Sequence, residues 1–138
     1  MAGTVSASGM LAGVLVDSDV LIWTLRGNPA ALATMQSLDD WHICAVSYME
    51  LAQGCRNKQE LERIKKGLAM RHTDILPVSG AISDRALQLV ETYAQSHVMQ
   101  LGDALIAATA MQHGLTVLSA NVKHFGAIDA LRLEAFLP

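Results

Sequence analysis

The sequence holds few of the features that mark a disulfide-rich or membrane-spanning protein. Its 138 residues include only two cysteines, Cys44 and Cys55. Two cysteines are too few for a disulfide scaffold and lack the paired spacing of a zinc site, so we expect both to be free thiols. Apolar runs such as residues 10–16 and 104–111 are far shorter than the roughly 20 residues that cross a bilayer. We therefore expect no transmembrane helix.

The sequence does not predict a secretory signal, and its composition is not strongly basic. No lysine or arginine precedes the first apolar run, which ends in Asp17 without a small-residue cleavage site, so we expect a cytoplasmic protein. A net charge of −3 and an isoelectric point near 5.9 argue against binding nucleic acid through bulk positive charge. However, six of the ten Lys and Arg residues lie between Arg56 and Arg71. This distribution fits either a local basic surface or an ordinary solvated helix face.

Apolar residues, in contrast, are abundant. The composition is 51% hydrophobic and 17% charged, with a mean hydropathy of +0.30, and a chain of this length buries roughly two thirds of its unfolded surface. We therefore expect one compact domain with a generous core. Residues 1–9 are small and polar with two glycines, which predicts a disordered extension before a domain at 10–138.

Short apolar strands alternate with helical patterns along the chain. We predict strands at residues 14–16, 42–46, 74–78 and 115–118, with a short last strand within 131–136. Helices are predicted at 20–25, 29–38, from 47 onward, 59–71, 83–96 and 102–113. This alternation indicates an α/β fold with a central parallel β-sheet flanked by helices. Such folds bind ligands beyond the carboxyl ends of their strands.

Proline and glycine predict several element boundaries. Asn28 followed by Pro29 is typical of a helix N-cap with proline at the first helical position. Gly114 predicts the end of the helix before it. Pro77 indicates that the third strand lies at a sheet edge or ends early, because proline cannot donate a hydrogen bond to a neighbouring strand.

Three carboxylates each have a purely structural explanation. Asp17 directly follows an apolar strand, where a carboxylate must be solvated, paired or bound to a cation, but aspartate there is also a common helix cap. Glu50 follows Ser47 at the spacing of a capping box, which predicts that Ser47 opens a helix. Asp103 begins an apolar helix, whose dipole favours negative charge. None of the three is diagnostic alone.

Taken together, the three carboxylates indicate a metal site. Each is expected to start a helix, and two of those helices follow strand ends on the same rim of the sheet. Two carboxylates about 5 Å apart repel by about 3 kcal/mol at an effective dielectric constant of about 20, so three resist ionising together without a cation. Oxygen ligands without a His or Cys cluster suit Mg²⁺ or Mn²⁺. Such ions activate water for phosphodiester hydrolysis, which is the chemistry of a nuclease.

Four segments around these residues form an ordered set. They are VLVDSDVLIWTLRGN at 14–28, VSYMEL at 46–51, LGDALIAATA at 101–110 and LSANVKHF at 118–125. Together they resemble the PIN-domain ribonucleases, especially VapC-type toxins, over nearly the whole chain after residue 9. The resemblance implies that Asp17, Glu50 and Asp103 are metal-binding and catalytic, with Ser119 as the hydroxyl of the last motif. It also implies a parallel sheet, Mg²⁺, an RNA substrate, homodimerisation and an antitoxin encoded beside the toxin.

The last segment departs from the family pattern at Asn121, where many members supply a fourth carboxylate. A neutral amide binds metal more weakly, so we expect Asn121 to lie beside Asp17 and Asp103 and to orient substrate without adding charge. Asp19 is either a further metal ligand or a cap of the first helix. His124 is a candidate proton donor, although a lone histidine there is more typical of a surface or capping position.

The leading hypothesis is a Mg²⁺-dependent endoribonuclease, the toxin of a toxin–antitoxin pair, that cleaves cellular RNA with water as nucleophile and inhibits translation and growth. An alternative, favoured by Asn121, is a catalytically inactive PIN-like domain that binds RNA or protein. A third interpretation is a phosphoacceptor receiver domain, to which the acidic strand ends and Lys123 superficially correspond. It is disfavoured because Ser18 splits the acidic pair expected at the first strand.

Overall fold

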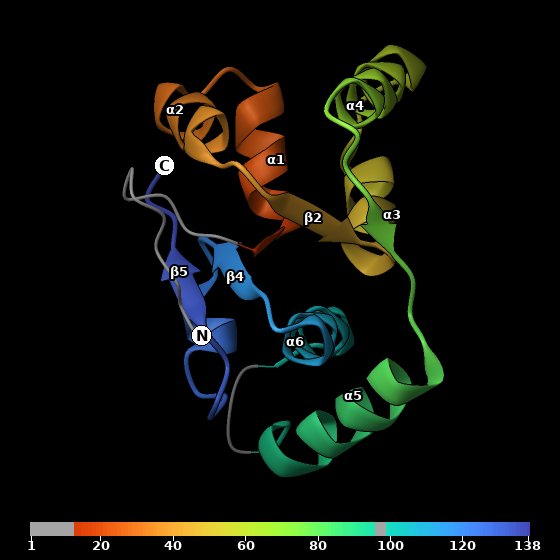
Figure 1. The fold of residues 1–138 in the computed structure, drawn as a ribbon, viewed down its shortest axis with the longest axis vertical. Coiled ribbons are helices and arrows are strands. Elements are labelled where there is room, and N and C mark those ends of the chain that lie inside the picture. Colours follow the sequence, from red (N-terminus) through yellow and green to blue (C-terminus); the bar gives the residue numbers. More distant parts are fainter. Residues whose placement is uncertain (1–12, 96–98) are drawn as a thin grey trace.

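The computed structural model describes residues 13–95 and 99–138, and a parallel β-sheet forms its centre (Figure 1). The five strands are ordered β3-β2-β1-β4-β5, and every neighbouring pair is parallel. They are β1 (Val14–Val16), β2 (Trp41–Cys44), β3 (Ile75–Leu76), β4 (Thr116–Ser119) and β5 (Leu133–Ala135). The predicted α/β fold with a central parallel sheet is confirmed.

Helices cover both faces of this sheet. Figure 1 shows α1 and α2 on one side of the strands and α5 and α6 on the other. The helices of the described segments are α1 (Ser18–Leu25), α2 (Pro29–Ser37), α3 (Ala45–Gly54), α4 (Lys58–Met70), α5 (Gly80–Tyr93), α6 (Leu101–His113) and α7 (Val122–Phe125).

The central strands are buried on both faces, as their continuous apolar runs predict. Leu15 and Val117 pack into one core cluster with side chains of α5 and α6. Val14, Val16 and Leu118 pack into a second cluster with side chains of α1, α2 and α4. Successive side chains of a strand point to opposite faces, which explains this division. The packing fixes the carboxyl ends of β1 and β4 side by side.

Several predicted boundaries are confirmed. Asn28 caps α2 by accepting a hydrogen bond from the Ala31 N–H at 2.9 Å, and Pro29 is the first helical residue. Gly114 ends α6 at a φ of 66°, in the left-handed region that glycine adopts without strain. β3, directly before Pro77, lies at the edge of the sheet.

The bounds of α5 and the presence of α7 differ from the prediction. α5 begins at Gly80 rather than at residue 83, because Ser79 caps it by accepting a hydrogen bond from the Ile82 N–H at 3.2 Å. The helix ends at Tyr93, before the expected end at residue 96, which itself lies outside the described residues. α7 is absent from the prediction because its four residues are too few to display a helical period.

The predicted capping box at Ser47 is wrong. β2 runs directly into α3, which begins at Ala45, and the Cys44 sulfur accepts the capping hydrogen bond from the Ser47 N–H at 3.4 Å. Ser47 is therefore a buried residue of the first turn, and Glu50 lies in the second turn. The start of the helix thus does not explain the Glu50 carboxylate.

Both cysteines are free, as expected. Over residues 13–95 and 99–138 none of the helices combines the length and the apolar character needed to cross a bilayer. The extension expected at residues 1–9 lies outside the described part of the chain, and the domain boundary at residue 10 stays a prediction.

Candidate active site

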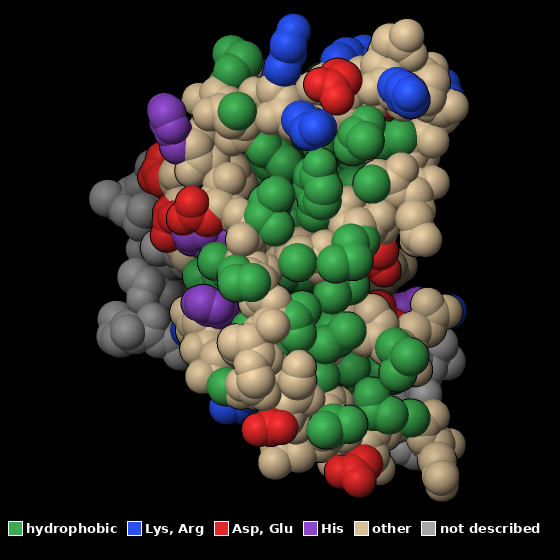
Figure 2. Space-filling view, turned by 90° about the vertical axis from the view of Figure 1, so that its right-hand side faces the viewer, with side chains coloured by type: hydrophobic (Ala, Val, Ile, Leu, Met, Phe, Trp, Pro, Cys, Tyr) green, Lys and Arg blue, Asp and Glu red, His purple; other side chains and the backbone are tan. Residues whose placement is uncertain are grey.

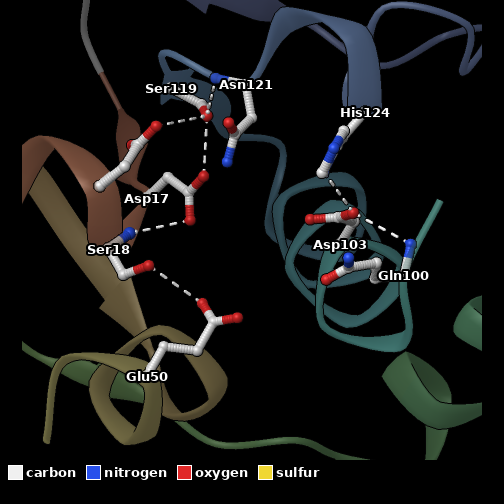
Figure 3. A network of polar contacts seen from close by, with 9 residues as sticks. Asp17, Ser18, Glu50, Gln100, Asp103, Ser119, Asn121 and His124 are labelled. Atoms are coloured by element: carbon white, nitrogen blue, oxygen red, sulfur yellow. Dashed lines mark hydrogen bonds and ion pairs between the residues drawn. The ribbon is translucent and has the colours of Figure 1, made fainter. Parts of the chain in front are cut away.

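Three acidic side chains from separate segments of the chain lie around one space beyond the carboxyl edge of the sheet (Figure 3). Asp17 follows β1 and caps α1, Glu50 belongs to α3, and Asp103 belongs to the first turn of α6. The Ser18 hydroxyl donates to Glu50 Oε1 at 3.0 Å, which ties α1 to α3. Glu50 Oε2 packs against α6, since a Cβ placed on Gly102 would lie only 2.9 Å from it. The fold thus brings together the three carboxylates that the sequence indicates.

Asp17 is the most buried of the three, with an exposed fraction of 3%. Its Oδ2 accepts a hydrogen bond from the Ser119 hydroxyl at 2.7 Å, and its Oδ1 accepts one from the Ser18 N–H at 2.8 Å. Burial and then the charge of Asp19 raise the pKa of Asp17 from 3.8 to about 7, against the effect of both hydrogen bonds. A carboxylate in this position needs a neighbouring cation to be stably charged at neutral pH.

Asp19 extends the acidic group and does not cap α1, because Asp17 has that role. Its Oδ2 accepts a hydrogen bond from the Ala120 N–H at 3.0 Å and lies 3.5 Å from the Ser119 hydroxyl. Its Oδ1 is buried and has no hydrogen-bond partner in the described structure. Burial raises the pKa of Asp19. An oxygen that is buried without a partner is costly unless a ligand satisfies it.

Glu50 is half-buried, and its carboxylate is held by the Ser18 hydroxyl alone among the described residues. Burial raises the pKa of Glu50, and the charges of Asp103 and Asp19 raise it further. Because a single hydrogen bond restrains its long side chain, Glu50 has the most freedom to turn toward a ligand.

Asp103 is held by two donors that contact the same oxygen. The Gln100 N–H donates to Oδ2 at 3.0 Å and forms half of a capping box at the start of α6. The imidazole Nδ1 of His124 lies 2.9 Å from the same Oδ2. The His124 side chain is 25% exposed, so it lies partly at the surface, and it contacts a candidate metal ligand.

Ser119 is the last residue of β4, and Asn121 follows the strand at the same edge of the sheet. Ser119 is fully buried, donates to Asp17 Oδ2, and accepts a hydrogen bond from the Asn121 N–H at 2.9 Å. Figure 3 shows the Asn121 amide pointing toward the space between Asp17 and Asp103, the position expected for it. The amide makes no capping hydrogen bond to α7, so its polar atoms are available to a ligand.

The charge and donor types of this group fit a hard divalent cation. No Lys or Arg within the described segments forms an ion pair with Asp17, Asp19, Glu50 or Asp103, and His124 is the single basic contact found there. Carboxylate and amide oxygens suit Mg²⁺ or Mn²⁺. Over the described residues, however, no three His, Cys, Asp or Glu side chains are arranged as a complete ligand set. A bound ion therefore requires side-chain movement, for which Glu50 has the freedom.

Three contacts of this site were not predicted: those of Ser18, Gly102 and His124. Each joins segments that are distant in sequence, and side-chain contacts of that kind leave no periodic signal. The one local signal is the position of Gly102 directly before Asp103, since glycine in a helix often marks the close approach of another group.

Comparison with known proteins relates the chain to nucleases. Residues 14–131 match the model of the PIN domain. The chain is 37% identical over 129 residues to ribonuclease VapC10 of Mycobacterium tuberculosis, covering 91% of this chain and 95% of that protein. It is 27% identical over 126 residues to the tRNA(fMet)-specific endonuclease VapC of Shigella flexneri, covering 87% and 95%. Among solved structures, a toxin–antitoxin complex from Klebsiella pneumoniae matches with a TM-score of 0.77 at 25% identity, covering 90% and 98%.

Proposed function

The chain belongs to the PIN-domain family, with a VapC ribonuclease among its relatives, and we propose that it is a Mg²⁺- or Mn²⁺-dependent endoribonuclease that acts as the toxin of a toxin–antitoxin pair. One observation carries the proposal: Asp17 is buried beside three further acidic side chains without a compensating Lys or Arg in the described structure. Membership of the PIN family excludes the receiver-domain alternative.

In this proposal Asp17, Glu50 and Asp103 hold the cation, and the Ser119 hydroxyl orients the Asp17 carboxylate. The Asn121 amide orients the scissile phosphate without adding negative charge. A divalent cation at such a site activates water and stabilises the charge that develops during phosphodiester hydrolysis.

The substrate we propose is a structured cellular RNA, whose cleavage inhibits translation and growth. The Shigella relative is named for its action on tRNA(fMet), which supports this substrate class. Some of the Lys and Arg side chains in the basic segment at 56–71 are paired with acidic neighbours, so this segment offers RNA less unpaired positive charge than its composition indicates. Arg63 lies near Glu60 at 3.8 Å and Lys65 pairs with Glu62 at 3.7 Å. These pairs favour a solvated helix face over a dedicated RNA surface.

The partner we propose is an antitoxin that binds an apolar groove between α1, α2 and α4. The groove has a volume of about 270 Å³, and the exposed Arg63 also lines it. An apolar groove of this kind accepts one face of an amphipathic helix. An arginine of the antitoxin would match the acidic site, because guanidinium pairs with carboxylates in planar geometry. The apolar lining includes Leu21, Leu25, Leu32, Trp41, Ile64 and Leu68.

We also propose that two copies of the chain associate in the cytoplasm through α5 and its neighbours. Figure 2 shows a band of apolar side chains on the face presented by α3, β3 and α5. Leu87 of α5 is 63% exposed and Leu101 of α6 is 72% exposed, and both line a shallow apolar groove between these helices. An exposed apolar band of this kind is typical of an interface.

Cleavage of RNA by the purified chain tests the proposed activity. We expect fragments from total RNA with Mg²⁺ or Mn²⁺, none with EDTA, and none from the isosteric variants Asp17→Asn and Asp103→Asn. Asp84 is an exposed carboxylate of α5. Asp84→Asn is therefore the matched control and should cleave like the wild type. Binding of RNA without cleavage in any metal would instead favour the catalytically inactive alternative.

A further inference from the structure

We propose that His124 is a positioning residue for the metal site. Its imidazole holds one oxygen of Asp103, so that the other oxygen is presented to the space shared with Asp17 and Glu50. This inference rests on the proposed function, since it assigns to His124 an effect on the affinity for the cation that the carboxylates bind.

The geometry at Asp103 separates its two oxygens into different roles. Oδ2 receives both the Gln100 N–H at 3.0 Å and the His124 Nδ1 at 2.9 Å. Because a carboxylate only accepts hydrogen bonds, the Nδ1 atom carries the hydrogen. Figure 3 shows the other oxygen of Asp103 directed away from His124, toward Asp17. Two donors on one oxygen fix the plane of the carboxylate and leave the second oxygen for a ligand.

The backbone that carries the imidazole is held in place by the core. Phe125, the next residue, is 1% exposed and packs into the core cluster on the α6 face of the sheet. The His124 N–H also bonds to the Asn121 carbonyl at 3.1 Å, which closes the turn that carries both side chains. α7 is therefore a fixed support, and His124 links it to α6. The same link sets the spacing between the Asn121 amide and Asp103.

Folding of α6 does not account for this contact. The capping box between Gln100 and Asp103 already satisfies the start of the helix, so the imidazole adds a second donor to an oxygen that has one. A histidine suits this position better than Lys or Arg does. Imidazole donates a hydrogen bond even in its neutral form, whereas Lys and Arg donate as cations that would oppose a bound metal ion.

Calorimetric titration of Mn²⁺ into the RNA-free chain tests the inference with three variants. Loss of a partner that orients a metal ligand typically weakens metal binding by about 10- to 100-fold, and we expect His124→Ala to show a loss of that order. His124→Asn keeps a donor at the place of Nδ1 and should recover most of the affinity. His124→Gln carries its donor farther from the backbone and should not recover it.

Two further readouts distinguish positioning from a merely structural contact. We expect the thermal unfolding midpoint of metal-free His124→Ala to equal that of the wild type, and its RNA cleavage to recover at saturating Mn²⁺. Unchanged or tighter Mn²⁺ binding by His124→Ala, with wild-type binding intact, overturns this inference and leaves the proposed function standing. If the wild type binds no Mn²⁺ and cleaves no RNA, the proposed function fails and the inference fails with it.

Discussion

Asp17→Asn should stabilise the metal-free chain at neutral pH, although it removes a residue of the proposed active site. The pKa of Asp17 is raised from 3.8 to about 7 in the folded chain, by burial first and the charge of Asp19 second. At a pH between these two pKa values, Asp17 is therefore protonated in the folded state and ionised in the unfolded state. The contribution of the Asp17 carboxyl to the free energy of unfolding is fully present below about pH 4 and is lost as the pH rises through about 7. Since one pKa unit corresponds to about 1.4 kcal/mol, the loss is about 4 kcal/mol.

Asparagine removes the charge and keeps the contacts. Its Oδ1 can accept the Ser18 N–H as Asp17 does, and its amide N–H can donate to the Ser119 oxygen in place of the bond that Ser119 now donates. Denaturant unfolding in EDTA between pH 4 and 8 measures the effect. We expect the stability of the wild type to fall by up to about 4 kcal/mol over this range and that of Asp17→Asn to fall much less.

Added Mg²⁺ should reverse the order of the two proteins, because an ion that binds only the folded chain stabilises it. The wild type should gain stability at pH 8, and Asp17→Asn should gain little. Asp84→Asn serves as the control, since this exposed carboxylate lies on α5 outside the site. Equal pH slopes for wild type and Asp17→Asn in EDTA would refute the reasoning, as would an Asp17→Asn protein less stable than the wild type at pH 8.

Substitutions at three other positions test separate parts of the account. Gly102→Ala places a Cβ 2.9 Å from Glu50 Oε2, so the affinity for Mn²⁺ measured by calorimetry should fall. Gly67→Ala is the control, because a Cβ built there would meet no other group within 4 Å, and it should leave the affinity unchanged. Equal affinities of the two variants would contradict the placement of Glu50. Asn121→Asp should tighten Mn²⁺ binding without RNA, and Asn121→Ala should slow cleavage at unchanged thermal stability; wild-type cleavage by Asn121→Ala removes its role. Leu87→Glu should give a monomer in light scattering, and an unchanged mass would exclude α5 from the interface.

The sequence was sufficient to predict the sheet and to indicate all three carboxylates, although its structural explanation for Glu50 was wrong. Asp17 directly follows an apolar strand, and Asp103 lies in the first turn of an apolar helix. Any α/β fold that buries these two elements leaves a carboxylate at the end of each. The parallel order of β1 and β4 then follows from the general rule for such folds, and it places Ser119 beside Asp17.

Glu50 and His124 show where sequence reasoning reaches its limit. The spacing of Ser47 and Glu50 matches a capping box, but the helix starts two residues before Ser47 because Cys44 ends β2 and caps α3 itself. The contact between His124 and Asp103 depends on how α7 follows β4, and a helix of four residues carries no periodic signal of its own. Contacts between separate elements require the tertiary structure.

The position of a bound ion is the most direct test of the central claim, that the acidic edge of the sheet binds a divalent metal. Crystals of the wild-type chain soaked in Mn²⁺ should give an anomalous density peak within about 2.5 Å of oxygens of Asp17 and Asp103, with Glu50 turned toward it. Crystals of Asp103→Asn soaked in the same way should give a much weaker peak. Anomalous density elsewhere and none at this edge would contradict the account.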